Sequence, residues 1–284
     1  MLKATKILVI VALILAQSLI LSNAVLAGIQ DESNRYNEQR FSPKNPPSKV
    51  DPSHLEVDPN SVNPAWSSDP TYHSDQQSTH KMITLNAVTI LYNDGKTNWY
   101  NIARYYRPQI IYGNDDADEG NLFYADHFYD PDTGLNYLGS SSYTAPNSSQ
   151  NYFNQAISLY KSGRKTDAFY ALGKSLHYLQ DMNNPHHASN KTAVNSNHLD
   201  YEKWANDNKW NYQYTSGGFY SYSGTAYGFS VNSSVNAKNY YTDVNNSNDK
   251  SQWSFATDMN LWRAQKTSAG LIGLFFGSVG ESER

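Results

Sequence analysis

Residues 166–182 read TDAFYALGKSLHYLQDM, and this stretch decides the fold. Its large apolar side chains recur at spacings of three and four residues, which is the pattern of one buried helix face. They are Phe169, Leu172, Leu176 and Leu179. Pro185 follows closely, and proline interrupts the hydrogen bonding of a helix interior. The spacing therefore predicts a helix that ends just before Pro185.

Helical spacing recurs along much of the chain. It predicts further helices over 80–92, 152–160, 198–206 and 254–276. The alternation of apolar and polar residues that marks a half-buried strand does not extend over a useful length in these stretches. Residues 207–250 are rich in Asn, Ser, Gly and Tyr, so we expect long loops with short pieces of structure there. The sequence thus predicts an all-α fold, formed by a single helical domain.

The first 27 residues have the pattern of a secretory signal peptide. Lys3 and Lys6 precede an apolar run over 7–16, and the sequence AVLA at 24–27 places small side chains before a cut after Ala27. The apolar run is shorter than the ~20 residues that a membrane-spanning helix needs. We therefore expect a secreted protein that keeps no transmembrane anchor after processing.

Residues 28–65 differ from the chain that follows. They contain six prolines and many polar residues, without helical or strand periodicity. Such a segment suits a pro-segment, a linker or a loosely draped arm. We interpret 28–65 as a pro-segment, which leaves 66–284 as the folded domain.

Composition limits the kinds of site that the chain can build. Its 284 residues include 22 Lys and Arg against 26 Asp and Glu, a net charge of −4, so no basic excess is available to hold a nucleic-acid backbone. Cysteine is absent, which excludes a disulfide scaffold, a thiolate metal site and a cysteine nucleophile. Any metal site must therefore use the eight histidines, the carboxylates or the chain terminus.

Histidines and carboxylates gather at the end of the central helix and just beyond it. His177 and Asp181 lie four residues apart, so on a helix their side chains share one face. His198 and Glu202 repeat this spacing, and the pair His186–His187 lies between them. One such pair is common by chance and usually forms a local hydrogen bond on a helix surface. Two pairs together with the adjacent histidines indicate a metal site, and ligands restricted to nitrogen and oxygen favour zinc.

An acidic patch lies further upstream, at Asp115, Asp116, Asp118 and Glu119, and the sequence DHFYDPDTG follows at 126–134. Its second half, DPDTG, is by itself typical of a turn. Because the spacing differs from that of an EF-hand loop, we do not predict a calcium site.

Taken together, these residues resemble the secreted bacterial zinc-dependent phospholipase C family, whose superfamily also includes zinc-dependent single-strand nucleases. The resemblance runs from Trp66 to the C-terminus. It is strongest over 168–181 and 187–190, and it includes 126–133 and 262–270. It implies an all-helical domain that binds three zinc ions in one cleft.

The resemblance also implies ligands for each of the three ions. The first ion would be bound by Asp115, His127, His177 and Asp181. Asp181 would bridge to the second ion, which His80 and the terminal amine and carbonyl of Trp66 would complete. The third ion would take His187, His198 and Glu202, with His186 as a bystander.

Trp66 can serve as a terminal ligand only if the chain is cut after Ala65, because a nitrogen within a peptide bond cannot coordinate zinc as an amine does. We therefore expect the removal of 28–65 to complete the second zinc site and to activate the enzyme. Without the resemblance, Trp66 would be interpreted as an ordinary buried aromatic residue.

The implied reaction is attack of water on the glycerol–phosphate ester of a phospholipid, which yields diacylglycerol and a phosphorylated head group. Asp115 is the first candidate for orienting or deprotonating the water, and Glu202 is the second. Head-group contacts would come from Asp69, Asp116 and Tyr124. Because Asp116 places an acid where the family has an aromatic residue, the preference for a choline head group stays open.

Two other interpretations compete with this one. The same zinc cluster could cleave single-stranded nucleic acid, with some of the 23 tyrosines and six tryptophans stacking on bases. A non-enzymatic binding module could instead hold structural zinc, but structural sites close their coordination, whereas this ligand set leaves open positions. We favour a monomeric phospholipase C that acts on lipid at a membrane surface or micelle and has no stable nucleic-acid partner.

Overall fold

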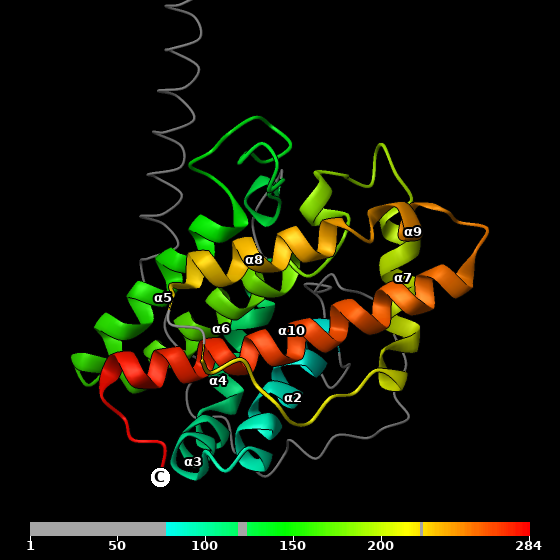
Figure 1. The fold of residues 1–284 in the computed structure, drawn as a ribbon. Coiled ribbons are helices and arrows are strands. Elements are labelled where there is room, and N and C mark those ends of the chain that lie inside the picture. Colours follow the sequence, from blue (N-terminus) through cyan, green and yellow to red (C-terminus); the bar gives the residue numbers. More distant parts are fainter. Residues whose placement is uncertain (1–77, 119–123, 222–223) are drawn as a thin grey trace, which may run out of the picture. The chain divides into compact units, whose positions relative to one another are not determined.

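The computed structural model describes residues 78–118, 124–221 and 224–284, which all belong to one compact unit of the chain, Val50–Arg284. The predicted signal peptide and pro-segment, with Trp66 and Asp69, lie outside the described residues. Figure 1 shows the fold. Its α-helices are α2 (Thr79–Asn93), α3 (Thr97–Tyr105), α4 (Arg107–Asp115), α5 (Ala145–Lys161), α6 (Lys165–Asp181), α7 (His198–Asn208), α8 (Ala226–Lys238), α9 (Tyr241–Asn245) and α10 (Lys250–Val279). Short 3₁₀ turns form η2 (Ala125–His127), η3 (His187–Ser189) and η4 (Lys209–Asn211).

All regular structure in the described ranges is helical, apart from an isolated bridge between Asp130 and Leu135. The all-α prediction is therefore confirmed. The predicted helices correspond to α2, α5, α6, α7 and α10. α5 begins earlier than predicted, at Ala145, where Pro146 occupies the first turn and costs no hydrogen bond.

The prediction of long loops over 207–250 is wrong for its second half. α8 forms there although its sequence, AYGFSVNSSVNAK, is poor in strong helix formers. Its buried face consists mainly of Ala and Ser side chains, which lets it pack against α5, α6 and α10. Thr225 caps the first turn by accepting a hydrogen bond from the Gly228 N–H. Packing and capping, rather than intrinsic propensity, stabilise this helix.

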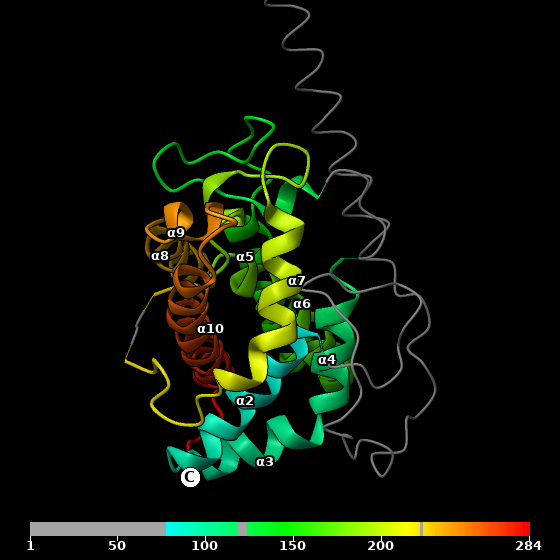
Figure 2. The same cartoon turned by 90° about the vertical axis from the view of Figure 1, so that its right-hand side faces the viewer.

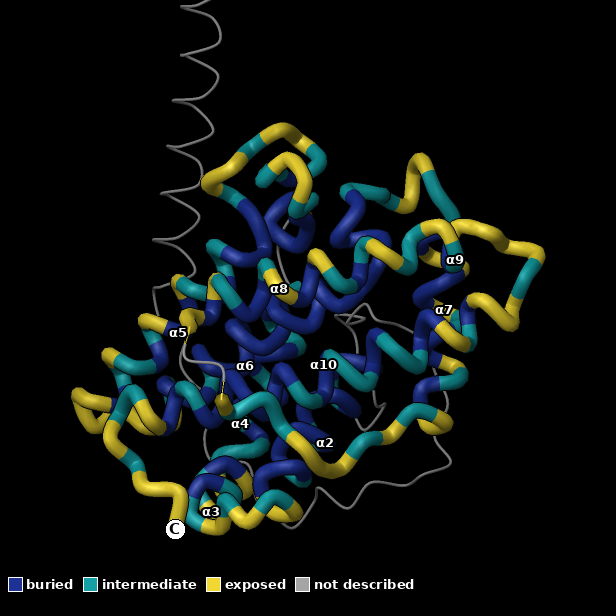
Figure 3. Tube along the Cα trace, viewed as in Figure 1, coloured by how far each residue is buried: buried dark blue, intermediate teal, exposed yellow. Residues whose placement is uncertain are grey.

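α6 is the central helix. Every residue from Ala171 to Asp181 is buried, whichever side of the helix it faces (Figure 3). α2, α4, α5, α8 and α10 all pack against it. Leu176 and Leu179 point into the main apolar cluster, as the 166–182 pattern predicts. The last turns of α6 are therefore held from several sides, which restricts the polar side chains that they carry.

The backbones of α4 and α6 are in contact where the two helices pack. A Cβ atom placed on Gly113 would lie 1.9 Å from the Tyr170 carbonyl oxygen, and one placed on Gly173 would lie 2.0 Å from the Ile110 carbonyl oxygen. Only glycine fits at these positions without moving a backbone. The two glycines thus set the separation of the helices, and with it the place of Asp115 at the end of α4.

α10 extends along the molecule and packs against α2, α5, α6, α7, α8 and α9 (Figure 1). Asp249 caps its start by accepting hydrogen bonds from the N–H groups of Ser251 and Gln252. Gly280 ends it in the left-handed conformation, with φ of 80°. None of the helices in the described ranges combines the length and the hydropathy that a membrane span requires.

The connections 128–144 and 190–197 lie at the same end of the helices in both views (Figures 1 and 2). The Asn190 Nδ2 group joins them by donating a hydrogen bond to the Leu135 carbonyl oxygen, at 3.0 Å. η2, η3 and the start of α7 flank these connections. Residues that lie far apart in the sequence therefore meet near the end of α6.

Candidate metal centre

Three groups of side chains in the described ranges have the composition and spacing of a metal site. Within each group, one potential ligand atom per residue lies within 4.8 Å of the others. The groups are His80, His177 and Asp181; Asp118, His127 and His177; and His187, His198 and Glu202. The first two share His177, so they form one continuous cluster.

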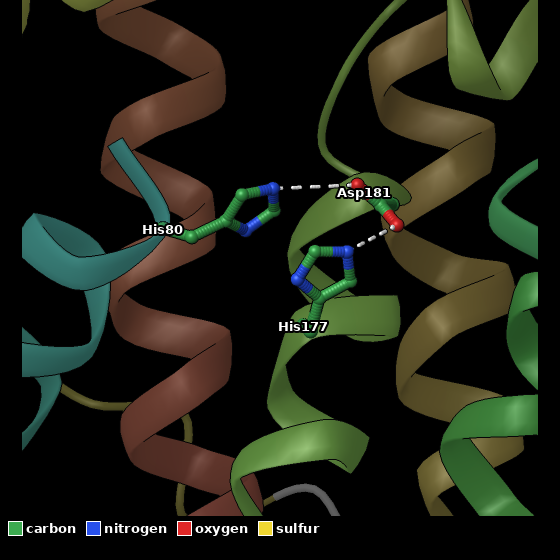
Figure 4. A group of neighbouring side chains, drawn as sticks. All are labelled: His80, His177 and Asp181. Atoms are coloured by element: carbon green, nitrogen blue, oxygen red, sulfur yellow. Dashed lines mark ion pairs between the residues drawn. The ribbon is translucent and has the colours of Figure 1, made fainter. Parts of the chain in front are cut away.

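Asp181 stands at the middle of this cluster. Its Oδ1 atom lies 3.4 Å from His80 Nε2 and 3.6 Å from His187 Nδ1. Its Oδ2 atom lies 2.8 Å from His127 Nδ1 and 3.3 Å from His177 Nε2. Figure 4 shows His80 and His177 directed at different oxygens of the same carboxylate. One carboxylate is thus in reach of four imidazole rings, a geometry suited to bridging two cations.

Local sequence explains how several of these side chains are presented. His177 and Asp181 lie one turn apart on α6, and His198 and Glu202 repeat that arrangement on α7. His80 lies in the first turn of α2, where the Ser78 hydroxyl caps the helix by accepting a hydrogen bond from the Lys81 N–H.

The third group is built around one oxygen of Glu202. Its Oε1 atom lies 2.6 Å from His198 Nε2 and 3.1 Å from His187 Nε2, and it accepts a hydrogen bond of 2.8 Å from Asn184 Nδ2. On its other side, His187 donates from Nδ1 to the His127 carbonyl oxygen at 2.9 Å. This bond ties the third group to the segment that carries the second.

Two aromatic contacts fix the rings of the third group. Phe128 stacks on His187, with ring centroids 4.5 Å apart and planes 3° apart. His186 stacks on His198 at 5.0 Å and 7°, and its Nε2 atom lies 3.0 Å from Asn197 Oδ1. Burial, followed by the nearby His198, lowers the pKa of His186 to about 3, so this ring is neutral. His186 belongs to none of the three groups, whereas its neighbour His187 does.

Charge pairing stabilises the buried ionised groups. Burial alone disfavours a charged His177, but the carboxylates of Asp118 and Asp181 outweigh it and raise its pKa well above the ordinary value. Burial likewise opposes ionisation of Asp181, yet His177 and the other imidazoles hold its pKa well below the ordinary value. In this part of the cluster, the pairing of the His177 ring with the carboxylates of Asp118 and Asp181 therefore outweighs the effect of burial.

The same balance applies in the third group. The carboxylates of Asp181 and Glu202 overcome the effect of burial on His187 and raise its pKa to about 9. In return, His198 and His187 hold the pKa of Glu202 below its ordinary value against burial.

The arrangement fits a divalent metal. The buried carboxylates of this centre are stable only with positive charge beside them. In the absence of metal, protonated imidazoles supply that charge, and a bound metal ion would replace their protons. The available ligand atoms are imidazole nitrogens and carboxylate oxygens, a set that zinc binds well.

Asp118, which the sequence interpretation did not assign as a ligand, lies within the candidate centre. Its Oδ1 atom lies 3.2 Å from His177 Nε2 and 3.5 Å from His127 Nδ1. Asp115, the predicted ligand, belongs to none of the three groups. Burial raises the pKa of Asp115 to about 6, although Lys81 and the nearby imidazoles oppose the shift. The acidic patch in the sequence contains both residues, but spacing does not reveal which one faces the histidines.

The residues predicted to contact the lipid head group differ in their exposure and in their contacts. Tyr124 has a half-exposed side chain, and its ring meets His127 edge to face with centroids 5.6 Å apart. Asp116 accepts a hydrogen bond of 2.5 Å from the Tyr170 hydroxyl. This carboxylate is therefore engaged with α6. Asp69 lies outside the described residues, as does Trp66.

Comparison with known proteins assigns the family. The model of the zinc dependent phospholipase C family matches residues 79–269, which is more than half of the chain. The chain therefore belongs to the zinc-dependent phospholipase C family, and the resemblance seen in the sequence is confirmed.

Several relatives carry the name phospholipase C. The protein from Clostridium perfringens is 29% identical over 243 residues, which cover 74% of this chain and 61% of that protein. The protein from Bacillus cereus is 30% identical over 249 residues, which cover 77% of this chain and 87% of that protein. The chain thus spans less than two thirds of the clostridial relative and most of the Bacillus one.

The fold is also found among solved structures. The α-toxin of Clostridium absonum matches with a TM-score of 0.65 at 26% identity, over 71% of this chain and 63% of that chain. The α-toxin from an avian strain of Clostridium perfringens matches with a TM-score of 0.64 at 29% identity, over the same shares.

Proposed function

We propose that this chain is a secreted zinc metallohydrolase, a phospholipase C that cleaves the glycerol–phosphate ester of phosphatidylcholine-like phospholipids. Its products are diacylglycerol and a phosphorylated head group. The observation that carries the proposal is the convergence of His80, His127, His177 and His187 on Asp181, each within 3.6 Å, in a chain of this family. Such a buried cluster of imidazoles around one carboxylate is suited to holding more than one cation.

The proposal includes three zinc ions. His177, His127 and Asp181 would hold the first ion, and Asp181 and His80 with the terminal amine of Trp66 would hold the second. His187, His198 and Glu202 would hold the third. The short distances from Asp118 to His127 and His177 support Asp118 as the remaining carboxylate ligand of the first ion.

The reaction joins a water oxygen to phosphorus and breaks the bond from phosphorus to the glycerol oxygen. Bound zinc supplies a Lewis acid that offsets the charge of the phosphodiester and makes water a better nucleophile near neutral pH. Asp115 would orient the attacking water and accept its proton; burial raises the pKa of its carboxyl to about 6, which suits a base that works near neutral pH, and this supports the role. Glu202 is the second candidate. The proton finally reaches the departing diacylglycerol oxygen.

Export and processing form part of the proposal. A signal peptidase removes residues 1–27, and a second cut after Ala65 removes the pro-segment 28–65. The second cut exposes the amine of Trp66 and so completes a zinc site. Mass spectrometry of active secreted protein is expected to give an N-terminus at Trp66, and active protein that begins at Gly28 would contradict this step.

A comparison of two substrates tests the activity. The zinc-loaded chain is offered a phosphatidylcholine emulsion and, separately, single-stranded DNA. We expect release of phosphorylated head group from the lipid and no cleavage of the DNA. Cleavage of DNA with intact lipid would instead assign the chain to the nuclease branch of the superfamily. Bound zinc without either activity would indicate a structural metal module.

A further inference from the structure

A buried amide side chain adjoins the metal centre. Gln180 on α6 is fully buried and precedes Asp181 in the sequence. Its Nε2 atom donates hydrogen bonds to the hydroxyls of Thr84, at 3.0 Å, and Ser268, at 3.3 Å. Its Oε1 atom accepts a hydrogen bond from Asn114 Nδ2 at 3.2 Å and lies 2.8 Å from His80 Nδ1.

These bonds determine which nitrogen of His80 carries the proton. The two donors of the Gln180 amide are directed at the hydroxyls of Thr84 and Ser268, and Asn114 donates to its oxygen. In this orientation of the Gln180 amide its oxygen faces His80 Nδ1, and because an amide oxygen can only accept, Nδ1 is the donor. In a neutral imidazole the other nitrogen then has a lone pair.

That other nitrogen is the one directed at the metal centre. His80 Nε2 lies 3.4 Å from Asp181 Oδ1, and Figure 4 shows the ring turned with this edge toward the carboxylate. We infer that Gln180 is a positioning residue, which holds His80 in the Nδ1-protonated form and so presents Nε2 to the metal. The inference rests on the proposed function, because His80 is there assigned as a zinc ligand.

The network reaches well beyond one hydrogen bond. Thr84 lies on α2, Asn114 on α4, Gln180 on α6 and Ser268 on α10, and all four side chains are fully buried. The orientation of one ligand ring is therefore linked to the packing of four helices. Hydrogen bonds to the second nitrogen of a ligating histidine usually fix its ring and raise its affinity for the metal.

Two variants of Gln180 distinguish a role in orienting the His80 ring from a general contribution to the stability of the fold. Gln180→Met keeps the size of the side chain and removes the acceptor, whereas Gln180→Glu keeps an acceptor next to His80. Gln265→Met is the matched control. Gln265 on α10 is also fully buried. Among the described residues it bonds to Asn86, to the Tyr214 N–H and to the carbonyl oxygens of Tyr212 and Leu261, all outside the three metal-site groups.

The ring of His80 is observed directly in the zinc-loaded full chain labelled with ¹⁵N-histidine. Its signals are assigned by their loss in His80→Asn. We expect a protonated, slowly exchanging Nδ1 and a metal-bound Nε2 in the unmodified chain. Gln180→Met should expose the Nδ1 proton to rapid exchange and weaken retention of one zinc ion against a chelator by about 10–100-fold. Gln180→Glu and Gln265→Met should leave both readouts close to those of the unmodified chain.

Two results would overturn the inference while leaving the proposed function intact. One is Gln180→Met with the His80 signals and zinc retention of the unmodified chain. The other is metal bound through Nδ1 of His80. A chain that takes up no zinc at all would instead contradict the proposed function, and the tautomer of His80 in that metal-free chain would still test the role of Gln180.

Discussion

At the scale of single residues, Asp181 is the carboxylate on which the metal centre depends most. It is buried, and it interacts with imidazoles from four separate segments of the chain. Its charge offsets the cost of placing those rings together away from water, and an amide of the same shape cannot do so.

We expect Asp181→Asn to lose zinc and nearly all activity, and His177→Ala to behave similarly. Metal content per chain and the rate of phosphatidylcholine hydrolysis measure these effects. Asp167→Asn is the control on the same helix, because Asp167 pairs with the exposed Arg164 at the surface. Full zinc content and full activity in Asp181→Asn would contradict the proposed role of this residue.

The two neighbouring acids of the upstream patch should differ in their effects. Asp118 lies within 3.5 Å of both His127 and His177, so Asp118→Asn should lower zinc content. Asp115 lies outside the three groups, so Asp115→Asn should keep its zinc and lower kcat. Metal analysis and steady-state kinetics on both variants distinguish these outcomes. Zinc loss in Asp115→Asn alone would support Asp115 as the ligand instead.

At the scale of secondary-structure elements, the contact between α4 and α6 is the most sensitive feature. A methyl group at position 173 would meet the carbonyl oxygen of Ile110 at 2.0 Å, and backbone atoms cannot move aside as a side chain can. Gly173→Ala should therefore force the helices apart and lower the free energy of unfolding by about 1–3 kcal/mol. Urea denaturation measures the change.

Gly277→Ala provides the matched control on α10. No atom lies within 4 Å of a Cβ placed there, so only the better helix propensity of alanine remains. This variant should be neutral or more stable by up to about 1 kcal/mol. If Gly173→Ala and Gly277→Ala had the same free energy of unfolding, the close contact of α4 with α6 would not limit the stability of the protein.

A helix could be predicted from the sequence where one of its faces is apolar and the other is polar. The leucines of α6 define that helix and its end before Pro185. The same approach fails for α8, because its buried face is mainly Ala and Ser and differs little in hydrophobicity from its exposed face. The spacing of His177 with Asp181, and of His198 with Glu202, indicates part of the site because helix geometry alone brings those pairs together.

Other parts of the site depend on contacts between segments that no spacing encodes. Asp118 approaches His127 and His177 only through the packing of α6 and η2 against the segment after α4. Gln180 contacts His80 across 100 positions of sequence. For this reason neither interaction could be predicted from the sequence.

At the scale of the whole molecule, metal binding should be linked to folding. The ligand candidates come from α2, the segment after α4, η2, α6, η3 and α7. A metal that binds them therefore links segments that lie far apart in the sequence. The dependence of stability on pH should therefore differ between metal-free and zinc-loaded protein.

In metal-free protein the pKa of His187 is raised to about 9 from an ordinary value of 6.5. The stability that this shift provides is complete below pH 6.5 and is lost as the pH rises through about 9. The pKa values of Asp181 and Glu202 are lowered, so their contribution is present above the ordinary carboxyl range and lost on acidification. Melting temperatures of chelated protein should therefore fall between pH 6.5 and 9, and zinc should remove most of that fall. A metal-free melting temperature that does not change over this range would contradict the account.

Zinc content and lipid hydrolysis measured on the same purified preparation test the central claim most directly. The account predicts three zinc ions per processed chain, and release of phosphorylated head group that stops when a chelator removes the metal and returns when zinc is restored. A purified chain that binds no zinc, or one that hydrolyses phosphatidylcholine at the same rate with and without its metal, would contradict it.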